Sequence, residues 1–154
     1  MIEKLLKRIF ELGLAVPEEL VGCSDQEISQ LEEKYQVKLP ESYKEFLLTM
    51  GKNFGRLVDT NEYRIDYDSV MTMTEKEQKF IDECKAEGEN VADLPKNTII
   101  ILGRSDGTQF YLIEAQDNTD SPVFYYNSDT EIVEKEFDSF WDVLKMFIAG
   151  PKVW

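Results

Sequence analysis

The stretch LPESYKEFLLTMG, residues 39–51, decides how this chain begins to fold. Its large apolar side chains recur at i, i+3, i+4 and i+7, the spacing that places them on one face of a helix. They are Tyr43, Phe46, Leu47 and Met50. Pro40 stands where a first helical turn begins, since proline loses no hydrogen bond there. Gly51 stands where a helix can end in a left-handed turn. The stretch therefore predicts a helix with one buried face.

Two more helices are expected before this stretch. The first covers residues 2–12, where the apolar residues form a broad face, and Gly13 and Pro17 interrupt it. Ser24 followed three residues later by Glu27 is typical of a capping box and predicts the start of the second. Its buried stripe is expected to be Ile28, Leu31 and Tyr35. The side chains expected to face water are Glu32, Glu33 and Lys34.

The pattern changes to strands after Gly51. YRIDY (63–67) alternates and indicates a strand, and residues 74–88 predict a helix capped by Thr74. That helix is expected to turn Phe80, Ile81 and Cys84 toward the core. The β-branched run TIIILG is typical of a central strand, and turn residues separate it from QFYLIEA, VFYYNS and IVEKEF. The last helix is expected to start at Asp138 or Ser139 and to end at Gly150 and Pro151.

This order of elements predicts a single α+β domain over residues 1–154. We expect a mostly antiparallel sheet of four to six strands, packed with N-terminal helices and a C-terminal helix. A chain of 154 residues is long enough for one domain with a substantial core. Hydrophobic residues make up 42% of it, which is typical of a globular protein.

The formal net charge is −14, and it is unevenly distributed. Residues 1–56 hold ten acids and eight bases, whereas residues 57–154 hold 21 acids and nine bases. Because a phosphate backbone is bound by lysine and arginine, we expect no direct contact with nucleic acid. The acidity is explained either by solubility or by a basic partner protein.

The N-terminal stretch, interrupted by Glu3 and Glu11, is typical of an amphipathic helix and not of a signal peptide. No apolar run approaches the roughly 20 residues of a membrane span. The only two cysteines, Cys23 and Cys84, are too few for a disulfide framework. We therefore expect a cytoplasmic protein with reduced thiols and no contact with a membrane.

Catalytic residues are scarce in the sequence. Histidine is absent, which excludes Ser-His-Asp and Cys-His catalysis and histidine-containing zinc sites. Both cysteines are expected to be inert, and Cys23, just before a helix start, is the better candidate for a reactive thiol. Asp117, Asn118 and Asp120 resemble calcium ligands, but the loop motif around them is incomplete. We expect no metal, no cofactor and no enzymatic activity, with a carboxylate-dependent hydrolase as a remaining alternative.

Two motifs resemble the SUKH superfamily. The first joins a helix containing Ile28, Leu31 and Glu32 to the L-P-x-x-Y-K-x-F-L-x-x-x-G pattern of residues 39–51. The second, LPKNTIIILGRSDGTQFYLIE, is similar to the family's apolar strand, glycine-containing turn and following strand, and the C-terminal helix led by Phe137 also fits. The resemblance covers residues 24–148, which leaves residues 1–22 as an N-terminal helical extension.

This resemblance implies a non-enzymatic protein that binds other proteins. The superfamily includes bacterial immunity proteins against polymorphic toxins and a yeast regulator of cell-wall synthesis. The first hypothesis is therefore an immunity protein that neutralises a cognate toxin, expected to be a basic nuclease, through an acidic surface. The second is a regulatory or scaffold domain that binds an endogenous protein. Neither hypothesis fixes the oligomeric state.

The partner-binding surface is expected on the strand half of the chain, because this half carries the excess of acids and because turns on a rigid sheet often hold binding residues. Outward aromatic residues could anchor the partner. The residues expected to bind are Asp66, Asp68, Asp106, Tyr111, Asp117, Asp120, Tyr125, Asp129 and Glu131.

Overall fold

The computed structural model describes residues 1–150 of the chain. Its α-helices are α1 (Ile2–Glu11), α2 (Asp25–Tyr35), α3 (Glu41–Met50), α4 (Tyr67–Ala86) and α5 (Phe140–Ala149). Its strands are β1 (Tyr63–Arg64), β2 (Thr98–Arg104), β3 (Gln109–Glu114), β4 (Val123–Asn127) and β5 (Val133–Phe137), and a short 3-10 helix, η1, spans Pro17–Glu19. Pro151, the expected end of the last helix, lies outside the described residues.

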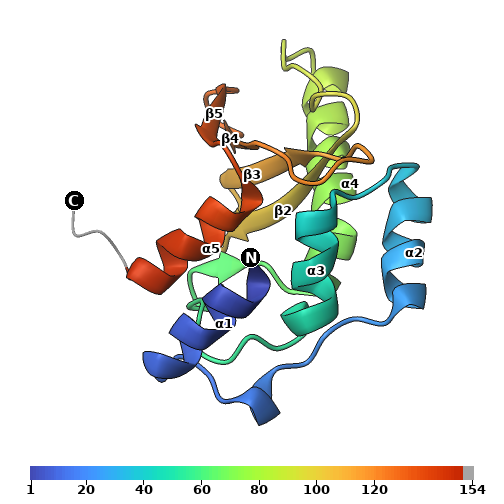
Figure 1. Cartoon of the computed structure of the whole chain (residues 1–154). Coiled ribbons are helices and arrows are strands. Elements are labelled where there is room, and N and C mark those ends of the chain that lie inside the picture. Colours follow the sequence, from blue (N-terminus) through green and yellow to red (C-terminus); the bar gives the residue numbers. More distant parts are fainter. Residues whose placement is uncertain (151–154) are drawn as a thin grey trace.

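The five strands form one antiparallel sheet in the order β1-β2-β3-β4-β5, so each strand pairs with the next one along the chain (Figure 1). Helices precede this meander, α4 joins its first two strands, and α5 follows it. The expected fold, a single α+β domain with N-terminal helices and a C-terminal helix, is confirmed.

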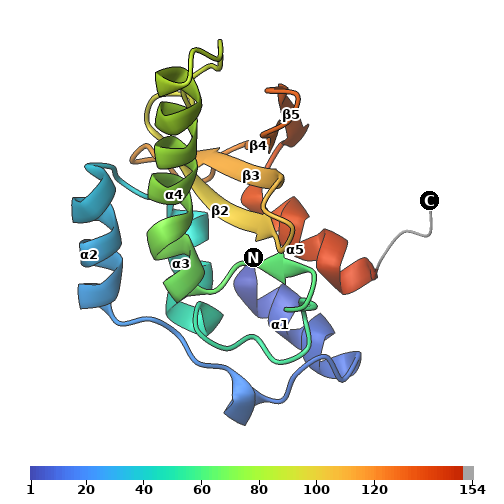
Figure 2. The same cartoon turned by 180° about the vertical axis from the view of Figure 1, so that it is seen from behind.

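Different helices cover the two faces of the sheet (Figures 1 and 2). Helix α4 packs on one face, where Ile81 joins a small apolar cluster of side chains from three strands. That cluster contains Ile100, Phe110, Leu112 and Tyr126. Helices α1, α3 and α5 contribute to the main core on the opposite face. The sheet residues of the main core are Ile99, Ile101, Leu102, Ile113 and Val123.

Helix α3 confirms the prediction from residues 39–51. The side chains of Tyr43, Phe46, Leu47 and Met50 are all 0% exposed. The ring of Tyr43 meets the ring of Phe140 edge-on, with 5.1 Å between centroids, and Phe46 lies 5.4 Å from the same ring. The predicted stripe is therefore the centre of the core, and it joins α3 to α5.

Gly51 does not end α3 in a left-handed turn, because its φ is −62°. The prediction was wrong in its mechanism, and the space around the residue explains why glycine stands here. A Cβ atom would lie 2.8 Å from the carbonyl oxygen of Leu47 and 2.9 Å from the Sγ of Cys23. The absence of a side chain therefore lets the end of α3 approach Cys23.

Helix α4 begins seven residues earlier than predicted, at Tyr67, with Asp66 as its N-cap. The Oδ1 of Asp66 accepts a hydrogen bond from the Ser69 N–H at 3.0 Å. Thr74 is therefore not a cap, and its hydroxyl instead accepts from the Ile100 N–H at 2.9 Å. The early start shortens the expected strand 63–67 to two residues.

Two predicted side-chain positions are wrong. Phe80 is 50% exposed, although Ile81 and Cys84 on the same helix are buried as expected. Glu32 is buried instead of facing water. Its Oε1 accepts from the Leu39 N–H at 2.9 Å, and its carboxylate pairs with Lys44 at 3.2 Å and Lys38 at 3.3 Å. Glu32 therefore holds the start of α3 against α2.

Two of the expected helix starts, at Ser24 and at Ser139, are confirmed. Ser24 and Glu27 form a reciprocal capping box, in which each side chain accepts a hydrogen bond from the backbone N–H of the other. Ser139, one of the two expected caps of the last helix, accepts from the Trp141 N–H at 3.0 Å. Helix α5 then ends at Gly150, whose φ of +78° favours glycine.

Candidate functional site

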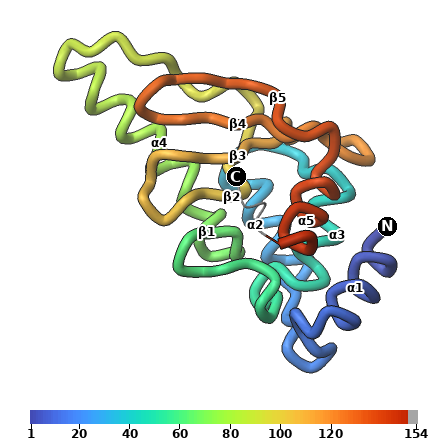
Figure 3. Tube along the Cα trace, turned by 90° about the vertical axis from the view of Figure 1, so that its left-hand side faces the viewer, coloured from blue at the N-terminus to red at the C-terminus, as the bar shows by residue number. Residues whose placement is uncertain are grey.

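The acids expected to bind a partner lie at different ends of the sheet. Antiparallel strands alternate in direction, so the β2–β3 and β4–β5 turns share one end and the β3–β4 loop lies at the other (Figure 3). Asp106, Asp129 and Glu131 belong to the first end, and Asp117 and Asp120 to the second. Strands of about six residues separate the two ends by roughly 20 Å.

The first end is closely tied together. The Ser128 N–H donates to the Thr108 carbonyl at 2.9 Å, which joins the two hairpin turns. Asp106 accepts from the Thr108 N–H at 3.1 Å and from its hydroxyl at 3.0 Å. These bonds hold the pKa of the Asp106 carboxyl below its ordinary value. Glu131 accepts from the Ala92 N–H at 3.2 Å, whereas the side chain of Asp129 is exposed.

Asp120, at the second end, is engaged inside the fold. Its Oδ1 accepts from the Ser42 hydroxyl at 2.6 Å and from the Ser121 and Phe140 N–H groups at 2.9 and 3.2 Å. Its other oxygen accepts from the Ser139 hydroxyl. These bonds tie the β3–β4 loop to the starts of α3 and α5. We therefore leave Asp120 out of the binding surface, while its neighbour Asp117 is exposed.

Asp66 and Asp68 lie away from both ends, at the start of α4. Asp66 is half-buried because it caps the helix. Asp68 is exposed, and its negative charge adds to the raised pKa values of Cys23 and Lys52. Neither residue belongs to the surface of the sheet.

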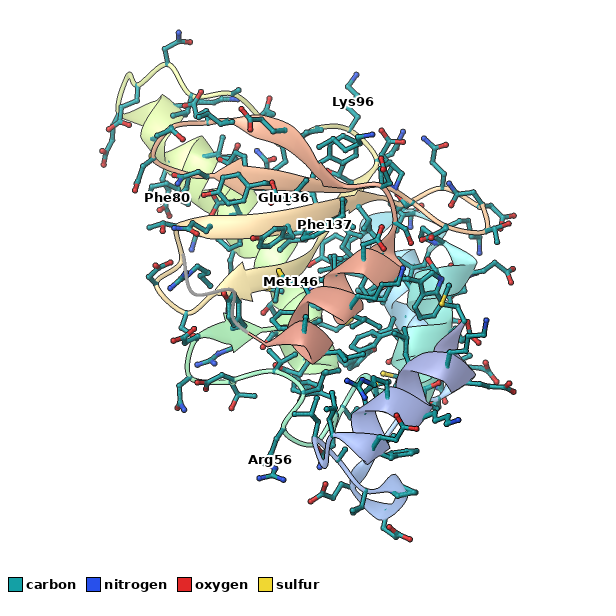
Figure 4. All side chains as sticks on the ribbon, turned by 60° about the vertical axis from the view of Figure 1, so that its left-hand side comes forward. Arg56, Phe80, Lys96, Glu136, Phe137 and Met146 are labelled. Atoms are coloured by element: carbon teal, nitrogen blue, oxygen red, sulfur yellow. The ribbon has the colours of Figure 1, made fainter. Side chains whose placement is uncertain are left out.

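Tyr111 and Tyr125 lie side by side on the face of the sheet that carries α5. They are register partners on β3 and β4, and their rings meet edge-on with 5.7 Å between centroids. The ring of Phe137, on β5, lies 6.2 Å from Tyr111. All three side chains are partly exposed. In Figure 4, Glu136 and Phe137 lie above α5 on this face of the sheet, so α5 does not close this part of the surface.

Charged groups surround Tyr111. The pKa of its phenol is raised to about 12, first by burial and then by the neighbouring Glu136 carboxylate, whereas Arg104 acts to lower it. Arg104 also lies 5.6 Å from the centre of the Tyr63 ring, within the range of a cation–π contact. We define the tyrosine face by the residues of this surface: Tyr63, Arg104, Tyr111, Tyr125, Glu134, Glu136 and Phe137.

Two of these seven residues, Tyr111 and Tyr125, were predicted from the sequence as binding residues, whereas the acids of β5 were not. Glu134 is the register partner of Tyr125, and both Glu134 and Glu136 are exposed. The alternation in VEKEF indicates that the two glutamates share a face. Which face they share depends on the register with β4, and that register shifts at an irregularity between Val123 and Phe124. The sequence carries no clear signal for this irregularity.

The thiols are not placed for chemistry. Cys23 is buried, and its burial together with Glu27 raises the pKa of the thiol to about 11. The pKa of Cys84 is also raised, first by burial and then by the neighbouring Glu89. A thiol with a raised pKa carries little thiolate near neutral pH, so neither cysteine is an activated nucleophile.

The described residues also contain two open grooves, each lined by both charged and apolar side chains. One, of about 570 Å³, lies between α2 and the β3–β4 loop and is lined by groups that include Glu33, Lys38 and Asp117. The other, of about 510 Å³, lies between α2, α4 and the segment that precedes β2. Within residues 1–150, no cluster of three potential metal ligands occurs. None of the helices in this range is both long and apolar enough to cross a membrane.

The family comparison agrees with the two motifs. The model of the SMI1 / KNR4 family (SUKH-1) matches residues 22–146, which is more than half of the chain. No curated protein matches the chain. Proteins of this family are generally non-enzymatic immunity or regulatory domains. The match begins just before the Ser24 capping box and ends within α5, so it contains the whole sheet. The chain belongs to the SMI1 / KNR4 family (SUKH-1).

Proposed function

We propose that this protein is a cytoplasmic immunity protein, which binds a cognate toxin domain and neutralises it. The observation that carries the proposal is membership of the SMI1 / KNR4 family (SUKH-1). Immunity by binding needs a recognition surface and no reacting groups. The tyrosine face offers such a surface, while the two thiols, the most nucleophilic side chains of the described part, are buried with raised pKa values.

The charge distribution supports a basic toxin, and a nuclease above all. A nuclease must present lysine and arginine to hold its substrate's phosphates. Residues 57–154 carry 21 acids against nine bases, and two of these acids, Glu134 and Glu136, lie beside the partly exposed Tyr125 and Tyr111. Opposite charge on two partners raises the association rate, to on the order of 10⁸ M⁻¹s⁻¹ at low salt. The inhibitor would therefore be drawn to the surface that the toxin needs for its substrate.

The alternative is a regulatory or scaffold domain that binds an endogenous protein. The same family membership favours it, and the tyrosine face would serve it equally well. The two functions differ in what happens when the partner is expressed alone. A toxin stops the growth of its host and the inhibitor restores it, whereas an endogenous partner does neither.

The test is to purify the protein with its partner from the native host, and to express that partner alone and together with the protein. The proposal expects toxicity alone and normal growth on co-expression. Reversing Glu134 and Glu136 to Lys should weaken this rescue and slow association several-fold at low salt. A matched control reverses Glu3 and Glu33, which are exposed acids on α1 and α2. A harmless partner, or an inhibitor that rescues through the helical half, would overturn the proposal.

A further inference from the structure

Strand β5 is an exposed edge of the sheet. It pairs with β4 on one side and has no strand on its other side within the described residues. Its residues 133–136 are all exposed, and the side chains of Ile132 and Val133 are 42% and 44% exposed. A free edge is a template on which another strand can form hydrogen bonds. The opposite edge, β1, has only two residues and offers much less backbone.

Two backbone bonds determine which groups of β5 face outward. The Ala115 N–H donates to the Asn97 carbonyl at 2.7 Å, and the Ser128 N–H donates to the Thr108 carbonyl at 2.9 Å. Bonding directions alternate from residue to residue along an antiparallel strand. Following this alternation from Ser128 along β4, the backbone groups of Tyr125 point toward β5. Glu134 is the register partner of Tyr125, so its N–H and C=O groups point toward β4. The same alternation leaves the N–H and C=O groups of Val133 and Lys135 pointing away from the sheet.

The side chains of β5 give the two faces of this edge different chemistry. Glu134 lies opposite Tyr125, so its carboxylate borders the tyrosine face, and the charge of Glu136 reaches Tyr111 on the same face. Lys135 points to the opposite face, and its ammonium group is paired with Asp138 at 2.6 Å. A strand added to β5 would therefore meet uncompensated negative charge on the tyrosine face, and mainly Val133 on the other.

We propose that β5 binds its partner by strand addition, and that the added strand alternates basic and apolar residues. The outward N–H and C=O groups of Val133 and Lys135 pair with its backbone. Its lysine or arginine side chains lie against Glu134, Glu136 and the ring of Tyr125, where charge attraction and cation–π contact act together. The proposed function supplies only the identity of the partner, as a segment of the toxin.

A second copy of this chain fits the edge poorly. If two β5 strands paired around Lys135, that lysine would face its own copy and Glu134 would face the Glu136 of the other chain. Pairing around Glu134 would place its carboxylate opposite its own copy. Like charges directly opposite each other destabilise a sheet, and each chain also carries a net charge of −14. The edge therefore favours a basic strand over self-association.

The test uses the full chain and a short synthetic peptide in which arginine alternates with valine. Amide resonances are followed by NMR during a titration. The inference expects the amides of Val133 and Lys135 to shift most and to become protected from exchange. Lys135→Pro removes an outward N–H and should lower the affinity at least about tenfold. Lys135→Ala, the matched control, loses the same charge but keeps the N–H, so it should bind at least as tightly as the parent chain does.

A second peptide with the same sequence carries methyl groups on alternate backbone nitrogens, which preserves its charge and blocks strand pairing. The inference expects it to bind at least about tenfold more weakly. Equal binding of both peptides, or equal binding to the proline variant, would show attraction by charge alone and overturn strand addition. Dimerisation of the free chain through β5 would overturn the choice of occupant. The peptide assay needs no toxin, so its result is separate from the test of immunity.

Discussion

The molecule contains two aromatic clusters with similar composition and very different surroundings. Tyr43, Phe46 and Phe140 lie within 5.1–6.0 Å of one another, and all three are 0% exposed. In the second cluster the ring of Tyr111 lies 5.7 Å from one neighbour and 6.2 Å from the other, and all three side chains are partly exposed. The distances between rings therefore agree within about 1 Å in the two clusters. The clusters differ in how far the helices bury them.

This difference separates stability from recognition. The closed cluster joins α3 to α5 and belongs to the motif that marks the family, so its rings contribute to folding. The open cluster contains two tyrosines, whose hydroxyl groups can form hydrogen bonds with a partner. Exposed glutamates border this cluster. The residues that best identify this family are consequently not the residues that we expect to touch a partner.

The largest expected effect comes from opening the closed cluster. Phe46→Ala should lower the free energy of unfolding by about 3–5 kcal/mol, because it leaves a cavity between α3 and α5. Urea denaturation measures this directly. Tyr125→Ala is the matched comparison in the open cluster and should cost about 1 kcal/mol. Similar losses in both variants would contradict the contrast between the two clusters.

Binding should show the reverse order. Truncation of an aromatic anchor at an interface typically costs 2 kcal/mol or more, so Tyr125→Ala should weaken binding of the purified partner at least about thirtyfold. Calorimetric titration measures the change. Phe80→Ala removes an aromatic ring of similar size, which is exposed on α4, and should leave the affinity unchanged. If Phe80 mattered and Tyr125 did not, the binding surface would lie on the other side of the molecule.

Glu32 should matter for stability in the same way as the closed cluster, because it holds the start of α3, the helix that carries Tyr43 and Phe46. Burial raises the pKa of its carboxyl, but the bonds from the Leu39 N–H, Lys44 and Lys38 outweigh burial, and the pKa lies below its ordinary value. A carboxyl whose pKa is lower in the folded state stabilises the fold at pH values above the unfolded pKa of about 4.3. This stabilisation is lost as the pH falls through the folded pKa. Glu32→Gln should therefore lower the free energy of unfolding by about 1–2 kcal/mol at pH 7, and by less below pH 4.

Glu77 on α4 should behave in the opposite way. Its carboxylate is buried with one oxygen that has no hydrogen-bond partner, and burial raises its pKa although Tyr126 opposes the shift. A raised carboxyl pKa in the folded state means that stability falls as pH rises from about 4.3 through the folded value. Glu77→Gln should raise the free energy of unfolding by about 1 kcal/mol at neutral pH and leave it unchanged below pH 4. A loss at neutral pH would show that the charge of Glu77 has a partner.

Local signals in the sequence predicted most of the fold. The spacing of Tyr43, Phe46, Leu47 and Met50, the capping box at Ser24 and the β-branched run before Gly103 each depend on neighbours along the chain. The errors arose where distant residues decide. Thr74 resembles a helix cap locally, but Asp66 caps an earlier start and the Thr74 hydroxyl binds the Ile100 N–H across the structure.

The candidate site was harder to predict, for the same reason. Tyr111 and Tyr125 were chosen because they alternate along strands, whereas Glu134 and Glu136 join them only through the register of β5 with β4. Asp120 shows the opposite case. It resembles an exposed loop acid in sequence, but hydroxyl groups from Ser42 and Ser139, 78 and 19 residues away, engage its carboxylate.

Hydrogen–deuterium exchange of the chain with and without its partner tests most directly whether the tyrosine face is the recognition surface. The partner should slow exchange in β5 and in the neighbouring strand β4, at residues 133–137 and 123–127. Exchange in α3 should be slow in both states because its core face is already sealed. Protection confined to α1 and α2, with β4 and β5 unchanged, would contradict the assignment of recognition to the open cluster.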